Sequence, residues 1–295
     1  MAATSSRPVP KNWWRDFFDP VMGEVLFPSS KIAQSGGEVD QVVKQTKAKP
    51  PLDVLDLACG IGRHSVRFAA RGFRVTGLDY SKPFLRAARR TAGAKGHHIK
   101  FVHGDMRRLN VPFAANTFDL AVCLYTSFGY FARRADDRKV LRAVYRVLRP
   151  GGAFVVNTIN GAAAVKRLRS PTSLGSEPLP NVFMIDQARY DKRNRQTVTN
   201  WTIIDARGAK TRVARKSFRV NMYSHSELKK LLKTAGFRIE TAWGMLQGGP
   251  FDPKKTWHQT IVARKPRGRR RKVTSSTRRS VRPPTRSRRW ATRQG

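Results

Sequence analysis

Short apolar runs alternate with amphipathic stretches along the first half of the chain. Runs rich in Val, Leu, Ile and Phe that end in polar or glycine residues are typical of buried parallel strands. We expect five such strands, at residues 52–58, 73–80, 99–105, 118–125 and 152–159. Stretches with apolar residues every three or four positions predict helices at 63–72, 81–95 and 136–148. This alternation predicts an α/β fold with a doubly wound, mostly parallel, Rossmann-like sheet.

The pattern changes after position 160. Three β-type runs lie within residues 182–222, separated by turn-like spacers, and predict an antiparallel β insertion. Ser224 and Glu227 have the spacing of a capping box and open a helix to residue 235. Two final strands are expected at 237–245 and 256–265. The Arg-Pro-Gly-Gly segment at 149–152 predicts a turn.

The chain is strongly basic, with 59 Lys and Arg against 19 Asp and Glu and a net charge of +40. The last 31 residues, 265–295, are rich in Arg, Ser, Thr and Pro, contain no acidic residue, and predict a disordered basic tail. Such a tail can contact nucleic acid without sequence specificity, or it can be a solubilising extension. We favour the first interpretation, because the rest of the chain is basic too.

Other composition features limit the classes of protein. Cys59 and Cys123 are isolated, so they predict neither a zinc cluster nor a disulfide framework, and no metal site is expected. No apolar run reaches the length of a membrane span, and the first residues lack the apolar stretch of a secretory signal. We therefore expect a cytoplasmic protein that does not cross a membrane.

A glycine bend follows the first predicted strand, in the segment Asp-Leu-Ala-Cys-Gly-Ile-Gly at 56–62. Gly60 and Gly62 allow a tight turn and close approach of a ligand to the backbone. Asp79 ends the next strand, about 20 residues further on, where a carboxylate can accept hydrogen bonds from ribose hydroxyls. A glycine pair can also be an ordinary strand–helix turn, but with Asp79 in place we favour nucleotide-type binding.

The charge beside the bend favours one kind of nucleotide. A dinucleotide site has a third glycine where Ser65 stands, and no Gly-Lys-Ser/Thr sequence follows to form a P-loop. Asp56 places a negative charge next to the bend, which is unfavourable for a diphosphate. The same charge suits a ligand that carries an ammonium and a sulfonium group. The sequence therefore favours S-adenosylmethionine.

On these motifs, residues 52–160 resemble the core of the class I S-adenosylmethionine-dependent methyltransferases. The segments at 56–62 and 103–106, with Asp79 and the Leu-Arg-Pro-Gly-Gly turn, carry this resemblance. It implies that Asp105 meets the adenine amino group and that Met106 packs on the ring. The cofactor-binding residues that it implies are Asp56, Ala58, Cys59, Gly60, Gly62, Arg63, Asp79, Tyr80, Asp105, Met106 and Leu124.

A fainter resemblance covers residues 12–264. The segment 124–131, the β insertion and the helix after Tyr223 are similar to small-molecule methyltransferases, including those that methylate amino sugars linked to nucleotides. The expected organisation is then an N-terminal helical and aromatic cap (1–50), an S-adenosylmethionine-binding core (51–160), an antiparallel insertion that caps the substrate (161–222), the C-terminal part of the α/β sheet (223–264) and the tail (265–295).

We predict an enzyme that transfers a methyl group to nitrogen or oxygen of a small-molecule acceptor. Tyr130, Tyr125 and His225, and also Tyr223, are the candidates that orient or deprotonate the acceptor, with Tyr130 favoured. For each of them a purely structural role is the alternative. A methyltransferase of RNA or the ribosome, and a nucleic-acid-binding protein with a relict cofactor fold, are the other functions considered.

Two further features have two interpretations each, and a third has one. Arg63 and His64 open a predicted helix beside the bend, where they either hold an anionic substrate or are solvated. The aromatic cluster at 13–18 is either a lid or an ordinary packed helix, and we favour the helix. Trp257 and His258 begin the last strand and are expected to pack.

Overall fold

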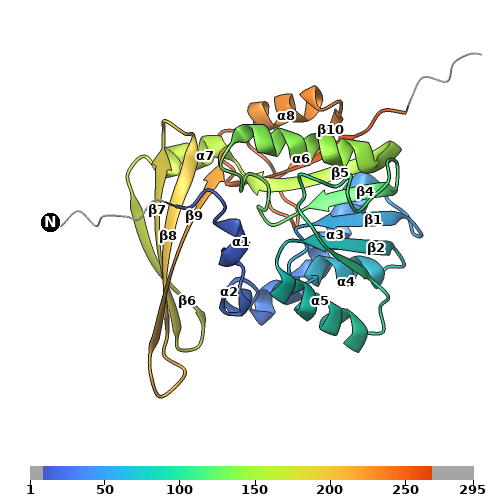
Figure 1. Cartoon of the computed structure of the whole chain (residues 1–295). Helices are drawn as coiled ribbons and strands as arrows, with labels where there is room; N and C mark the ends of the chain where they lie inside the picture. Colours follow the sequence, from blue (N-terminus) through green and yellow to red (C-terminus); the bar gives the residue numbers. More distant parts are fainter. Residues whose placement is uncertain (1–8, 268–295) are drawn as a thin grey trace, which may run out of the picture.

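The computed structural model describes residues 9–267 and confirms the predicted α/β fold (Figure 1). Its main sheet consists of β1 (Asp53–Leu57), β2 (Arg74–Asp79), β3 (Lys100–His103), β4 (Phe118–Cys123), β5 (Leu148–Ile159), β10 (Arg238–Trp243) and β11 (His258–Arg264). The seven strands lie in the order β10-β11-β5-β4-β1-β2-β3. All neighbouring pairs from β5 to β3 are parallel, whereas β11 is antiparallel to both β5 and β10. The sheet is therefore mostly parallel.

Helices cover both faces of this sheet (Figure 1). They are α3 (Ser29–Thr46), α4 (Arg63–Ala69), α5 (Lys82–Ala94), α6 (Arg134–Val147) and α8 (His225–Thr234). Val54 of β1 lies in one buried cluster with Val42 of α3, and its neighbour Leu55 lies in another with Val144 of α6. Successive residues of a strand point to opposite faces. The continuous apolar run of β1 thus fills both layers of the core.

Local sequence signals set the helix ends. The Ser81 side chain accepts a hydrogen bond from the Phe84 N–H at the start of α5, and the predicted capping box of Ser224 and Glu227 is present at the start of α8. These contacts satisfy backbone N–H groups that have no partner within the helix. The predicted helices and strands of the α/β core are present, with their ends shifted by a few residues.

The predicted turn at 149–152 lies within β5 as an irregular segment, rather than before the strand, and Gly151 has the left-handed φ of 87° expected of a turn glycine. β5 begins at Leu148 and continues through these residues, although its register against β4 shifts between Phe118 and Leu120. The Gly151 N–H donates to the Lys265 carbonyl, 2.8 Å away. This hydrogen bond ties the bent segment to the residue that follows β11.

The insertion forms a separate antiparallel sheet in the order β6-β7-β8-β9. Its strands are β6 (Thr172–Leu179), β7 (Val182–Asp191), β8 (Gln196–Asp205) and β9 (Arg212–Asn221). The prediction of an antiparallel insertion is confirmed, but the number of strands was wrong, because β6 was missed. This strand is exposed over most of its length and contains Gly175 and Pro178, so it has no apolar alternation. An edge strand tolerates such residues.

The N-terminal part contains two short helices before α3, and α7 precedes the insertion. They are α1 (Trp14–Phe17), α2 (Pro20–Leu26) and α7 (Gly161–Arg167). α1 and α2 lie between the two sheets (Figure 1). None of the helices in residues 9–267 has both the length and the apolar character needed to cross a membrane. The predictions for the tail concern residues 265–295, of which 268–295 lie outside the described part.

Two glycine substitutions test the helix ends and interiors. Gly236 follows α8 with a φ of 101°, and a Cβ there would lie 2.8 Å from the Tyr145 ring. We expect Gly236→Ala to lower the free energy of unfolding by about 1–3 kcal/mol, because alanine is strained at this φ and the ring must move. Gly37→Ala is the matched control, since Gly37 is exposed within α3 and an added Cβ meets no atom within 4 Å. It should raise the free energy of unfolding by roughly 0.5–1 kcal/mol in urea titrations. Equal effects of the two substitutions would contradict this account.

Candidate functional site

A cavity of about 540 Å³ lies between the two sheets, at the carboxyl ends of β1, β2, β4 and β5. Ligands of open α/β sheets commonly bind at this edge. The main sheet and its loops contribute the first part of the wall: Asp56, Ala58, Cys59, Gly60, Arg63, His64, Asp79, Tyr80, Asp105, Met106, Leu124 and Tyr130 among others. α1, α2 and the inward face of the insertion contribute the rest. The structure thus brings together all but one of the residues predicted to bind the cofactor.

The exception is Gly62, which belongs to the bend but packs against Ala88 and Phe101 and does not line the cavity. Its φ of 75° is left-handed, and a Cβ there would lie 3.0 Å from the Ala88 side chain. Gly60, with a φ of 57°, lies on the cavity wall, and its N–H donates to Asp79 Oδ2 at 2.8 Å. Ala58 also has a positive φ of 55°. Backbone strain of this kind is concentrated at functional sites.

Asp56 and Asp79 are buried carboxylates on this wall. Asp56 is 2% exposed and accepts a hydrogen bond from Ser65 Oγ at 2.6 Å. Burial raises the pKa of Asp56 to about 7, and the Ser65 hydroxyl opposes the shift. Burial also raises the pKa of Asp79, against hydrogen bonds from the N–H groups of Ser81 and Gly60. Within residues 9–267 neither carboxylate has an ion-pair partner closer than 4.0 Å, so both are free to balance a cationic ligand.

Asp105 and Met106 follow β3. Met106 is buried and lies on the wall. Asp105 already accepts hydrogen bonds on both oxygens from the Arg107 guanidinium, at 2.6–3.0 Å. A ligand amino group at Asp105 would share this carboxylate with Arg107.

Arg63 and His64 are neither solvated nor open to solvent anions. Both lie 2.6 Å from Glu38 Oε2 of α3, and the Arg63 and Glu38 side chains are only 3% and 2% exposed. Burial lowers the pKa of His64 to about 4, although Glu38 opposes the shift, so His64 is neutral at pH 7. Burial would raise the pKa of Glu38, but contacts with His64 and Arg63 outweigh it and lower the pKa. Sequence reasoning missed Glu38.

The loop after β4 brings two tyrosines to the cavity. Tyr125 has a φ of 57° and lies under the Arg63 guanidinium, 4.5 Å from ring centre to carbon Cζ. Tyr130 packs between Trp13 and Phe18, with ring centroids 4.9 and 5.9 Å away. Burial raises the pKa of Tyr130 above its ordinary value, so its phenol remains protonated at neutral pH.

The other two catalytic candidates do not line the cavity. His225 begins α8, and its Nδ1 lies 3.2 Å from Gln259 Oε1. Tyr223 donates a hydrogen bond to buried Asp137 at 2.7 Å. Their positions next to a helix cap do not indicate in the sequence whether they face the cavity, and the contacts that the structure gives them lie outside the cavity wall.

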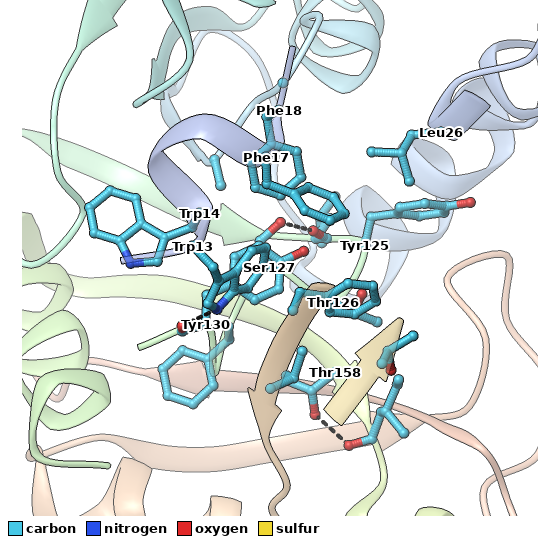
Figure 2. Close-up of a pocket in the computed structure, with 18 of the residues that line it drawn as sticks. Trp13, Trp14, Phe17, Phe18, Leu26, Tyr125, Thr126, Ser127, Tyr130 and Thr158 are labelled. Atoms are coloured by element: carbon cyan, nitrogen blue, oxygen red, sulfur yellow. Dashed lines mark hydrogen bonds between the residues drawn. The ribbon is translucent and has the colours of Figure 1, made fainter. Parts of the chain in front are cut away.

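The N-terminal aromatic residues combine the two interpretations given to them. Figure 2 shows Trp13, Trp14, Phe17 and Phe18 beside Tyr130 on the cavity wall. Trp13, Trp14 and Phe17 are also buried in the main core cluster. The helix is packed, as expected, and it covers the cavity as well. Trp257, expected only to pack, also contributes to the wall.

No metal centre is indicated by the side chains of residues 9–267. They contain no group of three or more His, Cys, Asp or Glu placed to hold a metal ion. Cys59 and Cys123 are both buried free thiols.

Comparison with known proteins gives a family for part of the chain. Residues 54–152 match the family described as a methyltransferase domain. The chain is 41% identical over 110 residues to a demethylmenaquinone methyltransferase of Thermus thermophilus, an alignment that covers 37% of this chain and 47% of that protein. It is 31% identical over 128 residues to a glycine/sarcosine N-methyltransferase of Halorhodospira halochloris, with 43% and 47% covered. The aligned region spans about half the length of these relatives.

Solved structures share the fold over most of the chain. An S-adenosylmethionine-dependent methyltransferase from Clostridium acetobutylicum has a TM-score of 0.71 at 17% identity, covering 83% of this chain and 96% of that one. The sugar N-methyltransferase KedS8 from Streptoalloteichus has a TM-score of 0.61 at 19% identity, covering 90% and 99%. These likenesses support the fold of the chain.

The Glu38 contacts predict a large effect on stability. We expect Glu38→Ala to lower the free energy of unfolding by about 3–5 kcal/mol, because it leaves the Arg63 charge buried without its partner. Asp40→Ala removes an acid from the same helix whose partner, Arg71, is partly exposed, and should change stability by less than about 0.5 kcal/mol. Urea titration followed by fluorescence distinguishes the two variants. A small effect of Glu38→Ala would mean that water reaches Arg63.

Proposed function

We propose that this protein, whose residues 54–152 form a methyltransferase domain of the class I S-adenosylmethionine-dependent type, transfers a methyl group from S-adenosylmethionine to a small-molecule acceptor. One observation carries the proposal. Asp56 and Asp79 stand at the exits of neighbouring strands, on the wall of a large cavity, and neither forms an ion pair with another residue of the described range 9–267. A positively charged nucleoside supplies the charge that the site lacks.

Each proposed cofactor-binding residue is assigned to a part of S-adenosylmethionine by its charge and its free hydrogen-bonding capacity. Asp79 keeps lone pairs for ribose hydroxyls although it accepts two backbone N–H groups. Asp56 faces the positively charged methionine portion of S-adenosylmethionine. Asp105 accepts a hydrogen bond from the adenine amino group, and Met106 packs on the adenine ring. The Nη2 nitrogen of Arg63 is buried without a hydrogen-bond partner among the described residues, and it can donate to the carboxylate of the ligand. These assignments follow the charge and position of each group.

Methyl transfer requires the protein mainly to position the donor and the acceptor and to exclude water from them. When bound, S-adenosylmethionine supplies a sulfonium methyl: the acceptor lone pair forms the new bond to carbon, and the electrons of the broken carbon–sulfur bond remain on sulfur. The aromatic wall around Tyr130 excludes water from this region. Because its phenol stays protonated, Tyr130 orients the acceptor by hydrogen bonding. The proton of the acceptor leaves to solvent.

A small acceptor fits the enclosure better than a polymer. The four-stranded insertion closes one side of the cavity and α1 another, and a volume of about 540 Å³ lies within the range of small-ligand sites. The relatives and structural neighbours named above include enzymes whose names state small acceptors, such as glycine, sarcosine or a sugar. We infer nitrogen or oxygen of a small molecule as the methyl acceptor.

Substitution of Asp79 tests the site. We expect Asp79→Asn to weaken S-adenosylmethionine binding by about 100-fold or more, because hydrogen bonds to a charged group contribute roughly 1.5–3 kcal/mol each. Isothermal titration calorimetry gives the Kd, and circular dichroism shows whether the variant is folded. Asp40→Asn, on exposed α3 surface, is the charge-matched control and should bind as the wild type does. Unchanged binding by folded Asp79→Asn would remove the basis of the proposal.

The pKa of Asp56 predicts a pH dependence. Burial raises this pKa to about 7, so the carboxylate becomes ionised as the pH rises from 6 to 8. A cationic ligand prefers the ionised form, and the Kd for S-adenosylmethionine should therefore fall about tenfold over this range. Asp56→Asn should abolish the pH dependence of the Kd.

Asp137→Asn is the control. Burial also raises the pKa of Asp137 to about 7, but this residue lies outside the cavity, so its variant should retain the pH dependence of the Kd. A flat profile in the wild type would contradict the role of Asp56.

A further inference from the structure

The insertion adds a fourth carboxylate to the cavity, beside Asp56, Asp79 and Asp105 of the main sheet and its loops. Asp186 lies in the middle of β7 and lines the cavity with Ala188, whereas the alternate residue Ile185 is exposed on the outer face. Residues of a strand alternate between faces, so the pleat directs Asp186 inward. Its neighbours on this inward face are Trp201 and Thr199 of β8.

Asp186 has no charge partner, in a chain where cations are abundant. Eleven of the nineteen acidic side chains form ion pairs. Asp186 forms none with any described residue. Its Oδ1 is buried without a hydrogen-bond partner, and so is Nε1 of Trp201, the residue directly opposite in register. Burial raises the pKa of Asp186 and outweighs the Trp201 indole N–H, which lies close enough to the carboxylate to lower this pKa although the two groups do not meet the geometry of a hydrogen bond.

The nearby cations are committed elsewhere. Lys216 continues the cross-strand row beyond Trp201, but its Nζ contacts Asp19 Oδ2 at 2.6 Å. Arg167 also lines the cavity, but it is exposed and lies over the Trp257 ring at 5.2 Å. An uncompensated carboxylate in a partly apolar cavity is unfavourable unless a ligand supplies the opposite charge.

We propose that Asp186 binds the protonated amino group of the methyl acceptor on entry, so that the acceptor of this enzyme is an amine. The ammonium then loses its proton to solvent, and the nitrogen lone pair that this frees attacks the methyl carbon. The inference rests on the proposed methyltransferase function and adds the chemical class of the acceptor. Trp201 and Phe218, which also line the cavity, offer aromatic faces that attract a cation. A neutral alcohol would leave the Asp186 charge unbalanced.

Asp186 acts in this scheme by holding the acceptor. It receives a hydrogen bond and a charge, and neither forms nor breaks a covalent bond. Its removal should therefore raise the KM for the acceptor more than it lowers kcat. A structural role, in which Asp186 only supports Trp201, would not discriminate between charged and neutral acceptors.

Matched pairs of probes test this role. Tryptamine and tryptophol, phenethylamine and phenethyl alcohol, and glucosamine and glucose differ only by an amino or a hydroxyl group at one position. We would titrate each into full-length protein saturated with S-adenosylhomocysteine. The wild type should bind at least one amine about tenfold more tightly than its alcohol, and Asp186→Asn should reduce this ratio to below about twofold. Any amine that is methylated should show a KM raised about tenfold in Asp186→Asn, with kcat changed by less than about threefold.

Glu177→Gln is the control with the same loss of charge. Glu177 is exposed on β6 of the same sheet and does not line the cavity, so its variant should keep the amine preference. A preference that survives in Asp186→Asn, or equal binding of amine and alcohol in every wild-type pair, overturns the proposal. Binding of S-adenosylhomocysteine alone is measured first. Its absence would count against the methyltransferase function, separately from the role of Asp186.

Discussion

The hydrogen bond from the Gly60 N–H to the Asp79 carboxylate determines the shape of the candidate site. It joins the exit of β1 to the exit of β2 at 2.8 Å, and the other Asp79 oxygen accepts the Ser81 N–H at 2.7 Å. One carboxylate thereby fixes a left-handed bend, the end of a strand and the start of α5. Two backbone dipoles partly compensate its buried charge, and it keeps acceptor capacity for a ligand.

The charge of the cavity is opposite to that of the molecule. The chain carries +40, yet Asp56, Asp79 and Asp186 line the cavity without ion pairs to any residue between 9 and 267. The basic residues of the cavity are arranged so that they do not cancel these acids: Arg63 is held by Glu38, and Arg167 lies over Trp257 at the surface. Because burial strengthens electrostatic interactions, the local acids outweigh the distant positive field for a ligand inside.

Much of the core could be predicted from the sequence, because its signals are local. Strands in a parallel sheet end at one edge, so Gly60 and Asp79, placed at two predicted strand ends, had to meet. Glu38 and Asp186 could not be found in this way. Glu38 meets Arg63 only through the packing of α3 on α4, and the inward direction of Asp186 depends on the register of an insertion whose first strand has no apolar pattern. The position of His225 away from the cavity wall could not be predicted either, because a polar residue at a helix start carries no information about which cavity it faces.

The N-terminal helix α1 belongs to the hydrophobic core and to the cavity wall at once. Trp13 Nε1 donates to the Tyr130 carbonyl, and the Phe18 carbonyl accepts from Ser81 Oγ, so this segment is attached both to the loop after β4 and to the cap of α5. Any compound that occupies the cavity touches rings whose burial also stabilises the native state. Occupancy of the cavity and folding of this segment are therefore thermodynamically linked: a molecule that binds only when residues 13–18 are folded stabilises them against local unfolding.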